Sequence, residues 1–112
     1  MIRAKFLVVD DDPDNREVVA SVLRDKGFEV DEALCAQDAL TLLGQVEYDV
    51  LITDVDMPGM SGLELVRLVR AKPESPYAVV MSGRAMAQLA AAAGAEEFFE
   101  KPFDLEEFLA VF

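Results

Sequence analysis

Hydrophobic residues follow two alternating patterns along this chain. Residues 6–9 form an uninterrupted apolar run, which is typical of a strand that is buried on both faces of a sheet. In residues 13–26, apolar positions instead recur every three to four residues, as on one face of a helix. Pro13 suits the first turn of this helix, and Gly27 is typical of a helix end. The chain therefore begins with a predicted strand and a predicted helix.

The same pair of segments recurs to the end of the chain. We predict strands at residues 6–9, 28–33, 48–53, 77–81 and 98–100, and helices at residues 13–26, 36–45, 61–71, 84–93 and 104–112. The second strand alternates apolar and acidic residues, which indicates an edge position in the sheet. Strands that alternate with helices through short connections favour a parallel α/β sheet. We predict one domain with a flavodoxin-like (βα)5 doubly wound five-stranded parallel sheet of order 2-1-3-4-5.

The charge balance and the cysteine content narrow the function classes. The chain has 22 Asp and Glu residues against 10 Lys and Arg residues, and its formal net charge is −12. Direct binding to nucleic acid requires a basic surface, so we expect none. The first residues lack the pattern of a secretion signal, and every apolar run is too short to cross a bilayer. The single cysteine, Cys35, fits a reducing compartment. These features predict a cytoplasmic protein without membrane insertion.

Charged side chains lie directly after several of the predicted strands. Asp10 and Asp11 follow the first strand, Asp54 and Asp56 the third, and Lys101 the fifth. Because the carboxyl ends of parallel strands meet at one edge of a sheet, these side chains should lie close together. Clustered carboxylates repel one another unless a cation or a shared proton offsets their charge, and Mg²⁺ prefers oxygen ligands. The pattern predicts a divalent-metal site with one carboxylate left for chemistry.

Four motifs together resemble the receiver domain of response regulators, the phosphorelay proteins of two-component systems, which include chemotaxis regulators. They are LVVDD at residues 7–11, DVDMPGMSG at 54–62, MSG at 81–83 and KPF at 101–103, and the resemblance covers residues 1–112. It implies a phosphorylation-dependent signalling switch and not an enzyme, although receivers promote their own phosphorylation and dephosphorylation. The implied partners are a sensor histidine kinase or phosphotransfer protein, which supplies the phosphoryl group, and a downstream protein whose identity the sequence does not give.

The resemblance also implies a role for each charged residue of the predicted site. Asp54 would accept the phosphoryl group and help to bind Mg²⁺, which Mn²⁺ can replace. Asp11 would coordinate the metal directly, whereas Asp10 would act mainly through metal-bound water. Asp56 would contribute its backbone carbonyl. Lys101 would pair with Asp54 and later with the phosphate. A mobile point charge such as a lysine ammonium suits a phosphate that changes position.

Three further residues, together with Asp56, match positions that control switching in the family. Ser82 would turn its hydroxyl toward the phosphoryl group, and Phe98 would be the aromatic switch residue. Asp56 and Arg84 would tune the lifetime of the phosphoryl group, with the Arg84 guanidinium bridging to Asp56 or to the phosphate. A structural interpretation stays open for Phe98, because an aromatic residue in a short strand usually belongs to the core. It also stays open for Asp56 and Arg84, because exposed ion pairs contribute little.

The C-terminal part of the chain departs from typical receivers. The segment between Ser82 and Lys101 is shorter than usual, so the fourth helix or the loop before it is trimmed, and the last helix is also short. The fourth helix belongs to the output face of the family, so partner recognition is the least transferable expectation. The bond between Lys101 and Pro102 is expected to be cis, as in the family.

Two other functions compete with the receiver interpretation. An Asp-x-Asp pattern at residues 54–56 after a buried strand is also found in haloacid-dehalogenase-like phosphatases. That family places the motif on its first strand and adds a cap domain, whereas here the motif lies in the middle of a short chain. The other alternative is a pseudo-receiver that docks partners without phosphorylation. Its usual signature is the loss of an acidic residue or of the lysine, and this chain retains them all.

Overall fold

The computed structural model describes residues 4–112, so most of the N-terminal segment in which we expected no secretion signal lies outside it. Its strands are β1 (Lys5–Val9), β2 (Glu29–Ala33), β3 (Val50–Asp54), β4 (Tyr77–Ser82) and β5 (Glu97–Glu100), and its helices are α1 (Pro13–Asp25), α2 (Ala36–Leu43), α3 (Gly62–Arg70), α4 (Ala87–Ala93) and α5 (Leu105–Ala110). Neighbouring strands are parallel, in the order β2-β1-β3-β4-β5. The predicted flavodoxin-like sheet is confirmed, and β2 is an edge strand.

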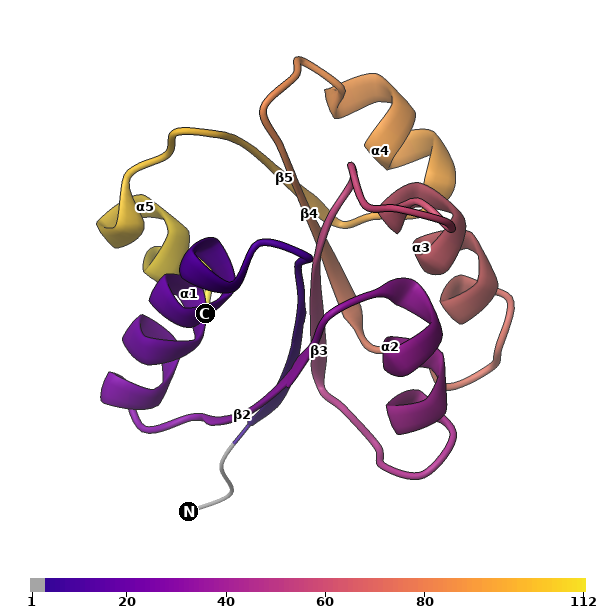
Figure 1. The fold of residues 1–112 in the computed structure, drawn as a ribbon, viewed down its shortest axis with the longest axis horizontal. Coiled ribbons are helices and arrows are strands. Elements are labelled where there is room, and N and C mark those ends of the chain that lie inside the picture. The colour runs from indigo at the N-terminus through magenta and orange to yellow at the C-terminus, as the bar shows by residue number, and fades with distance from the viewer. Residues whose placement is uncertain (1–3) are drawn as a thin grey trace.

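Helices cover both faces of the sheet. In Figure 1, α1 and α5 lie on one side, and α2, α3 and α4 lie on the other. Successive side chains of a strand point to opposite faces. Phe6 and Val8 therefore pack with residues of α1 and α5, whereas Leu7 and Val9 pack with residues of α2 and α3. This double burial explains the uninterrupted apolar run that predicted β1.

Three helices begin directly after a residue whose side chain caps them. The side chain of Asp12 accepts a hydrogen bond from the Asp14 amide at 3.0 Å. Ser61 accepts one from the Glu64 amide at 3.2 Å, and Asp104 accepts one from the Glu106 amide at 2.7 Å. Each bond satisfies an amide that has no partner within its own helix. These caps fix the starts of α1, α3 and α5.

The start of α4 differs from the prediction. We expected this helix to begin at Arg84, but it begins at Ala87. The Arg84 amide donates to the Ser82 hydroxyl at 3.0 Å, which holds the chain in a turn after β4. The N-cap position then falls on Met86, whose side chain makes no capping bond to the described part of the chain. The helix forms only where the alanine-rich segment begins, because alanine has the highest helix propensity.

The helix α5 is short, as expected, and an aromatic core holds it against the sheet. Phe108 is fully buried, and its ring contacts those of Phe99, Phe103 and Phe112 with centroids 5.2–5.3 Å apart. Aromatic pairs at such spacing add to the stabilisation from burial. None of the helices within residues 4–112 combines the length and the apolar character needed to cross a bilayer.

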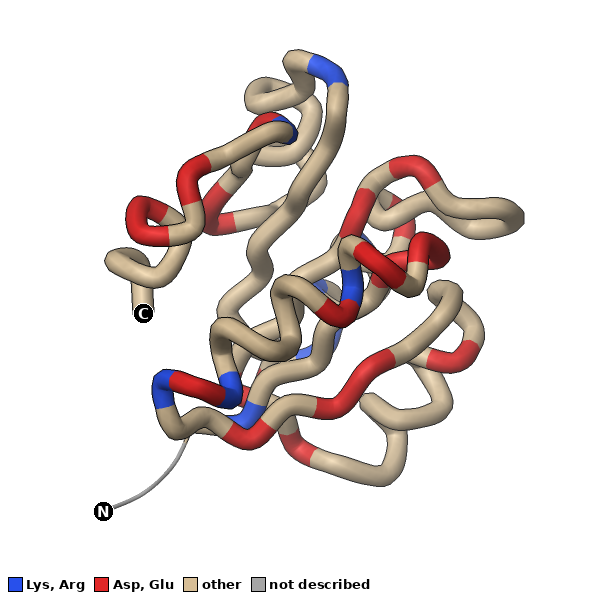
Figure 2. Tube along the Cα trace, turned by 60° about the vertical axis from the view of Figure 1, so that its left-hand side comes forward, with Lys and Arg blue, Asp and Glu red and all other residues tan. Residues whose placement is uncertain are grey.

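Acidic residues dominate the charged positions of the folded chain. Figure 2 shows them along several loops and helices, with fewer basic positions between them. The ends of β1, β3, β4 and β5 carry the site residues, so the sheet topology gathers side chains that lie far apart in the sequence. Ligand sites of such sheets form outside the carboxyl ends of the strands.

Candidate functional site

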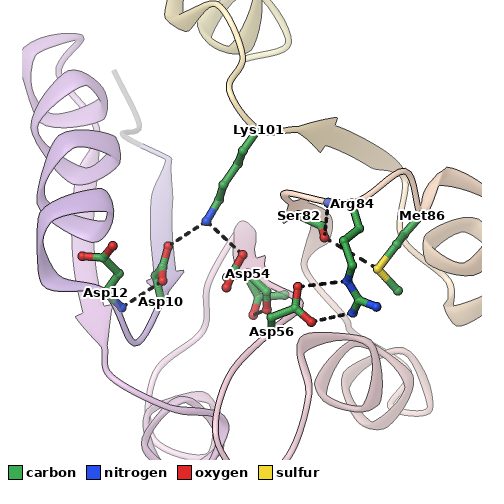
Figure 3. Close-up of polar contacts among 9 residues, drawn as sticks. Asp10, Asp12, Asp54, Asp56, Ser82, Arg84, Met86 and Lys101 are labelled. Atoms are coloured by element: carbon green, nitrogen blue, oxygen red, sulfur yellow. Dashed lines mark hydrogen bonds and ion pairs between the residues drawn. The ribbon is translucent and has the colours of Figure 1, made fainter.

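Two buried carboxylates and one lysine meet where β1, β3 and β5 end. The Lys101 Nζ atom lies 3.0 Å from Asp54 Oδ1 and 3.4 Å from Asp10 Oδ2. Figure 3 shows the lysine reaching down between the two acids. Asp10 is 1% exposed and Asp54 is 6% exposed, although aspartate is rarely buried without a partner. The structure therefore brings these three side chains together, as the positions of the strand ends predicted.

The buried position of these groups changes their protonation behaviour. Burial raises the pKa of Asp54 above its ordinary value, although the hydrogen bond and charge of Lys101 oppose this rise. The negative charges of Asp10 and Asp56 raise the Asp54 pKa further. Burial alone would lower the pKa of Lys101, but its contacts with Asp54 and Asp10 outweigh burial and raise it. Lys101 thus remains a cation, because the two neighbouring carboxylates stabilise its positive charge beside Asp54.

Asp10, Asp11 and Asp54 form a set of oxygen donors that fits Mg²⁺. Each offers one carboxylate oxygen, and the three oxygens lie within 4.8 Å of one another. Asp10 Oδ1 accepts from the Asp12 amide at 3.0 Å, and Asp10 Oδ2 faces Lys101. Asp11 is exposed, which leaves space for water on its side of the cluster. Hard oxygen donors with open water positions match the preference of Mg²⁺, so the residues present fit this metal.

A second arginine, which the sequence analysis did not identify, holds the backbone of Asp10. Arg16 Nη1 donates to the Asp10 carbonyl at 2.8 Å, and Arg16 Nε donates to Glu32 Oε1 at 3.1 Å. Glu32 also pairs with Arg24 at 3.2 Å. The Arg16 side chain is only 12% exposed. This network ties the β1–α1 turn to β2 and fixes the direction of the adjacent acids. Its only sequence signal was the position of Arg16 on the first turn of α1.

The end of β3 is held by close backbone packing against α3. The main-chain carbonyl of Asp54 accepts from Thr53 Oγ1 at 2.9 Å. Gly62 lies so close to this carbonyl that a Cβ atom would collide with its oxygen. The Gly62 amide also donates to the Val55 carbonyl at 3.0 Å. Glycine is required where backbones approach this closely. The sequence placed Gly62 at the start of α3, but did not reveal this contact.

The other side of the site lies after β4. Ser82 is fully buried, and its hydroxyl accepts from the Arg84 amide at 3.0 Å and donates to Met86 Sδ at 3.6 Å. The Arg84 guanidinium makes two bonds to Asp56, Nη2 to Oδ1 at 2.5 Å and Nε to Oδ2 at 3.4 Å. Both side chains of this pair are more than half exposed, at 63% and 53%. The bridge that the sequence suggested between Arg84 and Asp56 is therefore present, at the solvent edge of the site.

Phe98 lies on β5 beside Val80 of β4 and is half-buried. It packs against the core between α3 and α4, so its structural and switching interpretations are compatible. The end of β5 is linked to the end of β4 by a hydrogen bond from the Lys101 amide to the Ser82 carbonyl, at 2.7 Å. The peptide bond between Lys101 and Pro102 is cis, as the resemblance implied.

Comparisons with known proteins show which family this chain is similar to. The family model of the response regulator receiver domain matches residues 6–112. The chemotaxis protein CheY of Pseudomonas aeruginosa is 38% identical over 105 residues, which cover 88% of this chain and 85% of that protein. Three other response regulators match 92–97% of this chain, but the chain spans only 24–49% of their lengths.

Two solved structures show the same arrangement of strands and helices. The chemotaxis response regulator CheY4 of Vibrio cholerae has a TM-score of 0.91 at 33% identity, and the alignment covers 98% of this chain and 96% of that one. The response regulator TrrA of Thermotoga maritima has a TM-score of 0.87 at 32% identity, covering 96% and 95%. That structure was solved as a complex with Mg²⁺ and BeF. The similarity extends over nearly all of this chain.

Proposed function

The chain belongs to the family of response regulator receiver domains, which are phosphorylation-dependent signalling switches, and from this premise we propose that Asp54 is its phosphoacceptor. The observation that carries the proposal is the pairing of buried Asp54 with Lys101 at 3.0 Å, beside two further carboxylates. An isolated buried carboxylate would be destabilised, so its retention here with a cation and a metal-binding set indicates chemistry.

The proposed reaction transfers a phosphoryl group from a phosphohistidine to Asp54. A bond forms between an Asp54 oxygen and phosphorus, and the bond from phosphorus to the histidine nitrogen breaks. An anionic nucleophile and an anionic phosphoryl group repel each other, so catalysis depends on positioning and charge. Lys101 already contacts the attacking carboxylate and supplies a positive charge where the phosphoryl oxygens would arrive.

Asp11, Asp10, Asp54 and the backbone carbonyl of Asp56 would hold Mg²⁺ next to this carboxylate. When bound, Mg²⁺ would offset the negative charge on the phosphoryl oxygens. Asp11 is the exposed member of the set and suits direct coordination. Asp10 already has a partner at each oxygen, which suits contact through water. We infer that Mn²⁺ can replace Mg²⁺, because it also prefers carboxylate, carbonyl and water ligands.

Ser82 and Phe98 would report phosphorylation to the surface. A phosphoryl group adds about −1.5 to −2 charge and three acceptor oxygens. The Ser82 hydroxyl would rotate to donate to one of these oxygens, and the space it leaves would allow Phe98 to turn inward. Phe98 has no hydroxyl that could lock its inward position, so we expect weaker discrimination between the two states than a tyrosine would give.

The partners follow from the same reaction. A sensor histidine kinase or a phosphotransfer protein would supply the phosphoryl group, and a downstream protein would read the changed surface. The net charge of −12 supports the absence of direct nucleic-acid contact. In this proposal the chain is a signalling protein that promotes only its own phosphorylation and dephosphorylation. The cytoplasmic location and the single domain over residues 1–112 stay predictions.

Intact-mass analysis after incubation with acetyl phosphate tests the proposal. We expect a mass increase of one phosphoryl group in the presence of Mg²⁺ and none in the presence of a chelator. The Asp54→Asn variant, which keeps the side-chain volume, should give no adduct. An adduct that forms equally well in Asp54→Asn, or equally well in chelator, would contradict the assignment.

The same measurement, together with a turnover assay on a phosphoester substrate, separates the competing functions. A pseudo-receiver would give no adduct under any condition. A phosphatase of the haloacid-dehalogenase type would turn over many equivalents of a phosphoester substrate. Here Asp54 is the last residue of the central strand β3, and its lysine partner directly follows β5. This arrangement, together with the family membership, favours the receiver over both alternatives.

A further inference from the structure

The hydroxyl of Ser82 has an unusual donor partner. It is fully buried, accepts from the Arg84 amide at 3.0 Å, and directs its own proton toward Met86 Sδ at 3.6 Å. A thioether sulfur is a weak hydrogen-bond acceptor. In the view of Figure 3, Met86 and Asp54 lie on opposite sides of Ser82. The Ser82 proton is therefore directed to a sulfur atom and not to Asp54, the residue that would carry the phosphate.

Met86 also lies beside the second switch residue. It is half-buried in the core between α3 and α4, and Phe98 packs against the same cluster. Met86 and Phe98 line one cavity of about 350 Å³, together with Leu89 and Glu100. Met86 reaches this cavity from the N-cap position of α4, which lies only four residues after Ser82. One side chain thus reaches from Ser82 to the cavity beside Phe98.

We propose that Met86 is a positioning residue that holds the Ser82 hydroxyl in its resting orientation and sets how readily the switch turns. This inference rests on the proposed function of Ser82. Turning toward a phosphoryl oxygen exchanges a weak bond to sulfur for a charge-assisted bond, which is about twice as strong as a neutral one. The exchange is favourable because the resting acceptor is weak. A stronger acceptor at position 86 would retain the hydroxyl and oppose switching.

Substitutions that change only the acceptor test this role. Met86→Leu keeps an apolar side chain of similar size and removes the acceptor, and Met86→Gln provides an amide oxygen, which is a stronger acceptor. The probe is beryllium fluoride with Mg²⁺, and the measurement is its dissociation constant by titration calorimetry. We expect Met86→Gln to bind about fivefold more weakly than the parent, the factor that corresponds to one ordinary hydrogen bond. Met86→Leu should bind more tightly than the parent.

Two controls separate positioning from packing. Leu89→Gln places an amide in the same cavity, away from Ser82, and should leave the affinity unchanged. In a Ser82→Ala background, Leu and Gln at position 86 should give equal affinities, because a double-mutant cycle isolates the pairwise contact. Equal affinities of the two Met86 variants in the parent background would overturn the inference, as would a loss in Leu89→Gln as large as in Met86→Gln. A parent protein that binds no beryllium fluoride would instead overturn the proposed function of the site.

Discussion

The two sides of Asp54 differ in how firmly they are held. On the β1 side, Asp10 is buried and contacts Lys101, and Arg16 binds the backbone of Asp10 while pairing with Glu32. On the β4 side, the Arg84 ion pair with Asp56 is exposed. The Ser82 hydroxyl on that side donates only to a sulfur atom. Arg16 and Arg84 thus each pair with a carboxylate, but the Arg16 side chain is 12% exposed and the Arg84 side chain is 63% exposed.

This difference indicates a division of work between the two sides. Charged groups that accelerate phosphoryl transfer act best when they are fixed in advance, because no reorganisation is then needed during the reaction. A signal requires the opposite property, since contacts that change with phosphorylation must be exchangeable at a small free-energy difference. We therefore interpret the β1 side as the fixed chemical half of the site and the β4 side as its exchangeable half.

The largest effect is expected on Mg²⁺ affinity, when Asp10 or Asp11 on the β1 side is substituted. Asp10→Ala should weaken Mg²⁺ binding by about tenfold, the loss typical of residues that support a metal without binding it directly. Asp11→Ala should weaken it further, because we assign this exposed residue to direct coordination. Asp10→Ala should destabilise the fold more, since it leaves Lys101 and the Asp12 amide without that partner. Mg²⁺ titration and thermal unfolding of both variants would check this, and a reversed order of Mg²⁺ affinities would refute the assignment.

The raised pKa of Asp54 predicts a smaller effect on stability. Because burial raises this pKa, the folded state favours the protonated acid. This stabilisation is fully present below the ordinary pKa of aspartate and is lost as the pH rises through the raised value. Asp54→Asn mimics the neutral acid, so in chelator at pH 7 it should raise the midpoint of thermal unfolding by a few degrees. The difference should disappear in acid. A variant that is less stable than the parent at pH 7 would show that the Lys101 contact outweighs burial.

The smallest effect is expected at the exposed ion pair. Arg84 and Asp56 flank the site, and their contact would narrow the access of water to the phosphorus. Arg84→Ala should therefore lose the Asp54 phosphoryl group faster, by at most about fivefold, because exposed ion pairs contribute roughly 0–1 kcal/mol. Asp56→Asn is the matched variant from the other partner. Intact-mass analysis over time measures the rate at which the phosphoryl group is lost from Asp54. An unchanged or slower loss in Arg84→Ala would show that Arg84 does not restrict the access of water to the phosphorus.

The sequence predicted the fixed half of the site better than the exchangeable half. Asp10 and Asp54 lie at the ends of strands with strong apolar patterns, Lys101 directly follows β5, and parallel topology alone places strand ends together. The predicted start of α4 was wrong, because the true start depends on a hydrogen bond between Arg84 and Ser82. The contacts of Arg16 and Met86 could not be predicted, since each depends on packing between segments and not on the local pattern.

Amide chemical shifts, recorded with and without phosphorylation of Asp54, test the division of work most directly. We predict that resonances beside Asp54 move together with those from Gly83 to Glu100, because turning of Ser82 is coupled to α4 and Phe98. Resonances of the Arg16 and Glu32 network on the β1 side should move less. Shifts that are confined to the neighbours of Asp54, with residues 83–100 unchanged, would show that the β4 side does not respond to phosphorylation.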